Sequence, residues 1–185
     1  MADTSWSVEP AGAQRLAALC APNPQTGQAL RFDSIGRLAL SPPECLSGGG
    51  GLISTAADYH RFIELLRRGG ELDGVRLLGN RTVAYMTRNH LPGGADLEAL
   101  GRPLFAETTL DGMGFGLGFS VVDDPVQNKV LASPGEFAGG GMASTAFWVD
   151  PAEDVTALLF TQLMPSGTDP IRTQLKQLVF QALVA

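Results

Sequence analysis

The spacing of apolar residues changes part-way along this chain. Within residues 55–68 the apolar positions recur every three or four residues, which predicts one face of a helix. From Gly112 onward they recur every second residue, which is typical of strands. We therefore predict helices first, then antiparallel strands and then a closing helix, an α+β arrangement. The apolar face of the predicted helix consists of Tyr59, Phe62, Ile63 and Leu66.

Residues 1–110 are expected to form loops and helices. A short helix is predicted over residues 12–18, and the proline- and glycine-rich stretch 22–50 is predicted to be a covering loop or part of a larger unit. Thr55 and Asp58 resemble a capping box at the start of the apolar-striped helix. The side of that helix with Asp58, Arg61, Glu64, Arg67 and Arg68 is expected to face water.

Three signals follow that helix. Asp73-Gly74 predicts a tight turn, and Asn80 is expected to cap a second helix that continues to about Asn89. Residues 95–110 are predicted to be a loop.

Residues 111–185 are expected to hold the strands and the closing helix. We predict strands over 114–122, 142–149 and 155–163, the last of them buried on both faces, and a short one over 129–133. Asp169 is expected to cap the last helix, with Pro170 as its first residue. The inner face of this helix would consist of Ile171, Leu175, Leu178, Val179 and Ala182.

The stretch with most promise for chemistry begins at three consecutive glycines, Gly139, Gly140 and Gly141. They precede the alternating run 142–149, which Asp150-Pro151 ends. A glycine-flanked strand allows a substrate to approach the backbone, and its N–H groups can then stabilise a developing oxyanion. The alternative is a bulge or glycine-rich turn that leads into an ordinary core strand.

Composition and charge narrow the class of protein. The 185 residues suffice for a single domain over residues 1–185, and the net charge of −6 without a basic run argues against nucleic acid and anionic membranes as partners. No apolar run reaches the roughly 18 residues of a membrane span, and the first ten residues lack a signal-peptide pattern. A cytoplasmic location is therefore expected. Cys20 and Cys45 are expected to be reduced, with one disulfide as the alternative.

Familiar catalytic motifs are not found in the printed sequence. Three residues before its lysines, Lys129 and Lys176, stand Val126 and Thr173, so there is no Ser-x-x-Lys motif. There is no Gly-x-Ser-x-Gly motif, no histidine pair with metal-ligand spacing, and no Lys-Ser/Thr after the three glycines. We therefore predict no catalytic residue, no metal and no cofactor within these residues.

Several motifs in order nevertheless resemble serine hydrolases related to class C β-lactamases, penicillin-binding proteins and carboxylesterases. The matching stretches are Gly48-Gly-Gly-Gly-Leu-Ile-Ser-Thr-Ala-Ala-Asp-Tyr59, Gly74-Val-Arg-Leu-Leu78, Met113-Gly-Phe-Gly-Leu-Gly118, Gly135-Glu-Phe137 and Ser144-Thr-Ala-Phe-Trp-Val-Asp-Pro151. They run through most of the chain. The resemblance implies a β-lactamase/transpeptidase-like fold of which these residues are the C-terminal portion.

The resemblance also assigns roles by position. The family's third motif, Lys-Thr-Gly or its esterase counterparts, aligns with Gly139, Gly140 and Gly141, so glycine stands where Lys, His or Trp is usual. The N–H of the next residue, Met142, would be an oxyanion donor. The family's Ser-x-x-Lys and Tyr-x-Asn motifs lie further toward the N-terminus and do not occur here.

Two functions follow from this resemblance. In the first, the chain is the C-terminal part of a serine hydrolase that acts on a small ester or amide once an N-terminal half completes it. In the second, it is a non-catalytic homologue that binds a ligand or partner. Because the family's remaining strands are missing, the chain is expected to dimerise, to swap elements or to pair with a companion chain. A plain α+β binding module fits the periodicities but not the ordered motifs.

Overall fold

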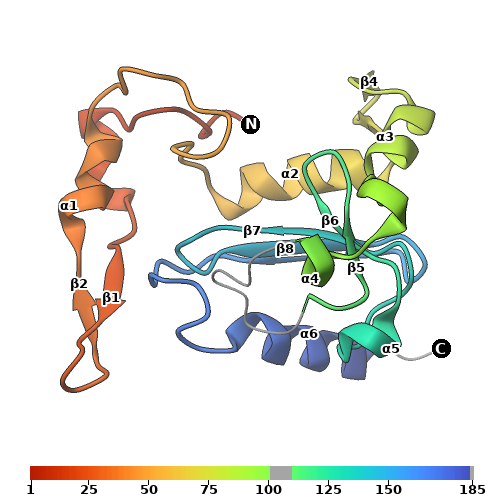
Figure 1. Cartoon of the computed structure of the whole chain (residues 1–185). Coiled ribbons are helices and arrows are strands. Elements are labelled where there is room, and N and C mark those ends of the chain that lie inside the picture. Colours follow the sequence, from red (N-terminus) through yellow and green to blue (C-terminus); the bar gives the residue numbers. More distant parts are fainter. Residues whose placement is uncertain (101–109, 184–185) are drawn as a thin grey trace.

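A five-stranded antiparallel sheet forms the centre of this computed structural model, which describes residues 1–100 and 110–183. Helix α2 lies on one face of the sheet and helix α6 on the other, while the first 50 residues extend to one side as an N-terminal arm (Figure 1). The predicted order of helices, antiparallel strands and a C-terminal helix packed on the sheet is confirmed.

The sheet is a simple meander in which each strand pairs with the next one along the chain. The order β5-β6-β7-β8-β9 places β7 at the centre and β9 at one edge. In β8 all five residues are buried, so this strand is covered on both faces. The strands are β5 (Met113–Phe115), β6 (Ser120–Val122), β7 (Phe137–Gly140), β8 (Ala146–Asp150) and β9 (Val155–Leu159).

The main core lies between the sheet and α2 (Ala56–Arg67). Ile63 is fully buried and packs in one cluster with Phe147 and Val149 of β8, and the predicted apolar stripe of α2 is confirmed. Thr55 caps the helix, since its Oγ1 accepts a hydrogen bond from the Asp58 N–H at 3.2 Å. The predicted cap is therefore also present.

The N-terminal arm consists of short elements with little burial. They are the 3₁₀-helices η1 (Pro10–Arg15) and η2 (Arg37–Leu40), the strands β1 (Cys20–Pro22) and β2 (Ala29–Arg31), and helix α1 (Asp33–Gly36). The first 3₁₀-helix replaces the helix predicted over 12–18, and the predicted loop 22–50 contains a hairpin. Cys20 joins the arm to the segment after β9, since its N–H donates to the Gln162 carbonyl at 2.8 Å.

Small elements connect α2 to the sheet. They are β3 (Glu71–Leu72), β4 (Val75–Arg76), α3 (Asn80–Met86), η3 (Pro92–Gly94), α4 (Leu97–Leu100) and, after β6, α5 (Pro125–Asn128). The predicted turn at Asp73-Gly74 joins β3 to β4, with positive φ at both residues. Asn80 is the first residue of α3 rather than its cap, which is Gly79, and the helix ends at Met86. Part of the loop predicted over 95–110 lies outside the described residues.

Four strand predictions need correction. The stretch 114–122 is a hairpin, β5 and β6, because Gly116 and Gly118 lie in the turn between them. Residues 129–133 are not a strand. The run 142–149 becomes a strand only at Ala146, and β9 ends at Leu159 with its residues half-buried, as befits an edge strand.

Two predicted helix faces also differ from the structure. Glu64 was expected to face water but is buried at the contact of α2 with β9, where the Thr156 hydroxyl donates to its Oε1. In α6 (Ile171–Ala182) Leu178 is 63% exposed and Ala182 is also exposed, so the inner face is narrower than predicted. Pro170 is the N-cap of α6, in place of Asp169.

The cap on α2 supports the helix that covers the sheet. We expect Thr55→Ala to lower the free energy of unfolding by about 1 kcal/mol, because the Asp58 N–H loses its acceptor. Urea denaturation followed by circular dichroism measures the change. The control is Thr82→Ala, at an exposed position in α3. Equal stability of the two variants would contradict the capping role.

Candidate functional site

The three glycines lie at the end of the central strand. Gly139 and Gly140 belong to β7, and Gly141 begins the turn into β8. They therefore do not precede a strand that starts at Met142, as the sequence suggested. They end one strand and lead into a hairpin turn, which matches the glycine-rich-turn alternative.

Strand β7, which carries Gly139 and Gly140 and is called the glycine strand below, has beyond Ala138 only one neighbour among the described strands. Strand β6 pairs with β7 only at Phe137 and Ala138, whereas β8 continues to Gly140. The Gly141 N–H donates to the Thr145 carbonyl at 2.9 Å, so by antiparallel alternation the backbone groups of Gly140 point away from β8. This end of β7 therefore offers an open strand edge to a peptide- or ester-like group.

The turn after the glycines places one backbone donor at the same end of the strand. Gly141 to Ser144 form a turn in which the Ser144 N–H donates to the Gly141 carbonyl at 3.1 Å, and Ser144 has a φ of 65°. Among the described residues none accepts a hydrogen bond from the Met142 N–H. The Met142 side chain is about half exposed. The donor proposed from the sequence is thus available.

Side chains of the protein itself fill the space beside each glycine. A Cβ at Gly139 would lie 2.6 Å from the Phe147 ring, one at Gly140 would lie 3.1 Å from the Arg172 guanidinium carbon, and one at Gly141 would lie 2.4 Å from Thr145 Oγ1. A side chain at any of the three positions would therefore have to displace a neighbouring side chain. The room that the sequence suggested for a substrate above these Cα atoms is occupied, and only the strand edge is open.

Ser54 and Ser144, the two serines within the family-like stretches considered as nucleophiles, are not arranged as nucleophiles. Ser144 is 3% exposed and its Oγ donates to the Leu163 carbonyl at 2.8 Å. Ser54 Oγ lies 2.9 Å from Thr4 Oγ1, a hydroxyl that cannot act as a base. Both hydroxyls serve the local structure.

A buried ion pair connects helix α6 to the residue that precedes β7. Lys176 Nζ lies 2.5 Å from Oε1 of Glu136, the residue before β7, and the two side chains are 13% and 1% exposed. Burial raises the pKa of Glu136 to about 7, against the opposing effect of the Lys176 ammonium and with a smaller contribution from Asp150. Removal of this carboxyl from water therefore outweighs the single cation beside it.

Arg172, one turn earlier in α6, contacts the glycine turn itself. Its Nη2 donates to the carbonyls of Gly141 at 2.6 Å and Thr145 at 3.0 Å. Neither Arg172 nor the role of Lys176 was predicted from the sequence. Their i, i+4 spacing beside the inward Leu175 was a usable signal, because two cations on a covered helix face need acceptors.

A second charged cluster connects α2 to the turn between β8 and β9. Arg67 holds Glu64 by hydrogen bonds from both Nε and Nη2, and it also contacts Asp154. These bonds lower the pKa of Glu64 to about 2 despite its burial. Glu64 is thus committed to Arg67, and does not form a ligand pair with His60, its neighbour at i−4.

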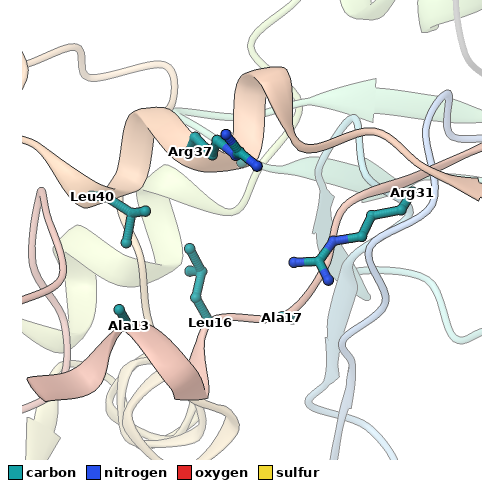
Figure 2. A pocket seen from close by; sticks show the side chains of 7 residues that line it. Ala13, Leu16, Ala17, Arg31, Arg37 and Leu40 are labelled. Carbon is teal, nitrogen blue, oxygen red and sulfur yellow. The ribbon is translucent and has the colours of Figure 1, made fainter. Parts of the chain in front are cut away.

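The N-terminal arm contains a separate hollow of about 130 Å³ between η1 and η2 (Figure 2). Leu16 and Leu40 face each other across it, and the side chain of Arg31 reaches toward it. All of its lining residues come from positions 13–40, so it belongs to the arm and not to the glycine strand.

Three further observations bear on the expectations from sequence. Within the described ranges no group of three or more His, Cys, Asp or Glu side chains is placed to hold a metal ion. Cys20 and Cys45 are both free thiols. None of the helices in the described part of the chain is both long and apolar enough to cross a bilayer.

Together, the sheet with a helix on each face and the glycine strand ending in a turn define a β-lactamase/transpeptidase-like fold, of which this chain is a C-terminal portion. The family model described as Beta-lactamase matches residues 1–181, and the chain belongs to that family. The resemblance inferred from the sequence is therefore confirmed.

Known proteins similar to this chain are much longer than it. Protein Rv1367c from Mycobacterium tuberculosis is 37% identical over 169 residues, which is 89% of this chain but 40% of that protein. The unliganded simvastatin synthase LovD from Aspergillus terreus is 20% identical, with a TM-score of 0.78 over 99% of this chain and 47% of that chain. EstCE1, a hydrolase with promiscuous acyltransferase activity, is 21% identical, with a TM-score of 0.74 over 96% of this chain and 46% of its own. The chain thus spans less than half the length of these relatives.

The raised pKa of Glu136 predicts a pH-dependent stability. Unfolded, this carboxyl ionises near its ordinary pKa of 4.5, whereas the folded protein keeps the proton to about pH 7. The free energy of unfolding should therefore fall as the pH rises from 4.5 to 7. The expected fall is about 3 kcal/mol, because each pKa unit of difference between the two states corresponds to about 1.4 kcal/mol.

Glu136→Gln should remove this fall between pH 4.5 and 7, because glutamine does not ionise. Urea denaturation at a series of pH values measures it. Glu153→Gln, at an exposed position, is the matched control and should keep the fall. The same pH dependence in both variants would show that Glu136 is not its source.

Proposed function

We propose that this chain is the C-terminal part of a serine hydrolase or acyltransferase that works through an acyl-enzyme, with its nucleophile on a segment or chain outside these residues. The observation that carries the proposal is the available Met142 N–H at the open end of the glycine strand. Membership of the Beta-lactamase family and the missing Ser-x-x-Lys motif support the same division of roles.

In this proposal the chain binds the substrate and the oxyanion. The acyl group of a small ester or amide lies along the open edge of β7 beside Gly139, Gly140 and Gly141. A serine hydroxyl from the other part attacks the carbonyl carbon, and the carbonyl oxygen takes the negative charge. The Met142 N–H then donates to this oxygen. The alcohol or amine leaves with a proton, and water or a second alcohol takes the acyl group.

The absence of a cation at position 139 favours esters over β-lactams. Gly139 stands where the family resemblance expects Lys, His or Trp, and the Phe147 ring blocks that side of the strand. The Arg172 guanidinium is already bound to two backbone carbonyls. Neither position 139 nor Arg172 therefore offers a side chain placed to bind a substrate carboxylate.

Uncovered surfaces support the need for a second part. Strand β9 is an edge of the sheet as described, and the N-terminal arm exposes large apolar residues. The most exposed of them are Leu38 and Leu46. A companion segment that adds a strand at β9 and covers the arm would bury them. The free thiols are in keeping with a cytoplasmic location, which we include in the proposal.

A second candidate function is a non-catalytic homologue that binds a ligand or partner at the same strand edge. The observation that favours it is the engagement of Ser54 and Ser144 in local hydrogen bonds, which leaves no activated nucleophile at either position. The two functions differ in whether the chain gains activity when a nucleophile is supplied.

A serine-directed fluorophosphonate distinguishes these possibilities. We expect no adduct in the intact mass of the chain alone, because Ser144 is buried and Ser54 has no base. When the chain is mixed or co-expressed with an N-terminal segment of the family that carries Ser-x-x-Lys, we expect one adduct on that segment and hydrolysis of p-nitrophenyl butyrate. The segment alone is the control.

Failure of the mixture to label or hydrolyse would favour the non-catalytic function. A stoichiometric adduct on this chain by itself would overturn the proposed division of roles, since a serine within it would then be the nucleophile.

The exposed edge and arm predict self-association. At tens of micromolar we expect the isolated chain to be a dimer or larger by multi-angle light scattering, and to form a 1:1 complex when the N-terminal segment is added. Replacing Leu38 and Leu46 with serine should reduce the self-association, because it removes exposed apolar surface. A monodisperse monomer would contradict this prediction.

A further inference from the structure

Arg172 holds both ends of the turn that carries the Met142 N–H. Its Nη2 donates to the Gly141 carbonyl at 2.6 Å and to the Thr145 carbonyl at 3.0 Å. The Gly141 N–H donates to the same Thr145 carbonyl from within the hairpin. One guanidinium nitrogen thus bridges the first and last residues of the turn, and fixes their separation from the α6 side of the sheet.

The contact with Gly141 acts on the candidate oxyanion donor through a single peptide group. The Gly141 carbonyl and the Met142 N–H belong to the same amide, whose two ends are coupled by resonance. A carbonyl that accepts a hydrogen bond from a cation becomes more polarised, and hydrogen-bond cooperativity makes its N–H a stronger donor. The 2.6 Å distance is shorter than that of an ordinary N–H···O bond, as expected when the donor is charged.

The glycine at position 140 makes this contact possible. A Cβ there would lie 3.1 Å from both Cζ and Nη1 of Arg172, which is closer than ordinary packing. The guanidinium therefore lies against the bare backbone of β7. A side chain at position 140 would therefore displace the guanidinium from its present contact.

We propose that Arg172 is a positioning residue for the oxyanion donor: it fixes the Gly141–Thr145 turn and polarises the peptide that presents the Met142 N–H. This inference rests on the proposed function for its catalytic consequence. The contact acts from the face of β7 that α6 covers, so Arg172 itself does not touch the substrate.

Backbone NMR on the full chain tests the contact directly. In Arg172→Gln the Met142 amide proton should move upfield, because its peptide loses polarisation. Hydrogen exchange at the Gly141 and Ser144 amides, which are bonded within the turn, should become about tenfold faster. Arg172→Lys keeps the charge and should give smaller changes of the same sign.

Gln174→Ala, at an exposed position two residues along α6, is the matched control and should leave these signals unchanged. Arg172→Gln spectra in which the Met142 resonance and the turn exchange rates match the control would overturn the proposal. Equal acceleration of exchange throughout β7, β8 and β9 would also overturn it, because Arg172 would then be a general stabiliser of the sheet.

Kinetics of the completed enzyme test the consequence. With the N-terminal segment present, Arg172→Gln should lower kcat for p-nitrophenyl butyrate about tenfold with little change in KM, since the donor acts on the transition state. If the mixture hydrolyses nothing while the Met142 resonance still shifts, the proposed function fails and the positioning contact stands. An unshifted resonance overturns the positioning role whatever the activity.

Discussion

The burial of β8 on both faces is the constraint on which the rest of this structure depends. All five residues of the strand are buried, and Val149 and Asp150 are fully so. A strand in this position needs a cover on each side. Helix α2 supplies one cover through Ile63, and α6 supplies the other. The central strand β7, the turn after it and the ion pair behind it are all placed by this packing.

This constraint also explains why glycines end β7. On the α2 face the Phe147 ring fills the space beside Gly139, and on the α6 face Arg172 fills the space beside Gly140. Side chains at these two positions would clash with the Phe147 ring on one face and with the Arg172 guanidinium on the other. What remains accessible is the backbone, along the edge that β6 does not reach. Glycines at the end of β7 therefore allow close packing on both faces of the sheet, while the backbone at the strand edge stays open.

Helices and strands could be predicted from the sequence where neighbouring residues alone determine the structure. Thr55 and the apolar stripe were enough for α2, and the alternation through Phe147 and Val149 was enough for β8. The predictions failed where a residue's environment depends on a partner far away in the sequence. Glu64 looked solvated until β9 brought Thr156 to it, and the run at 114–122 looked continuous although its glycines make a turn. The roles of Arg172 and Lys176 depend on a strand some thirty or more residues earlier, which periodicity within α6 does not reveal.

The charged side chains around β7 hold the strand and its turn in place, and they lie apart from the edge where a substrate would bind. Glu136 and Lys176 are buried before the strand begins, and Arg172 is bound to backbone carbonyls at its end. All three lie on the α6 side of the sheet, away from the open edge of β7 and its backbone groups. An edge of this kind can bind a neutral acyl group and stabilise charge that appears only during the reaction. In the proposed function, the nucleophile and the proton acceptor come from the surface that faces this edge. A second part that also covers β9 and the N-terminal arm would bring that surface into place.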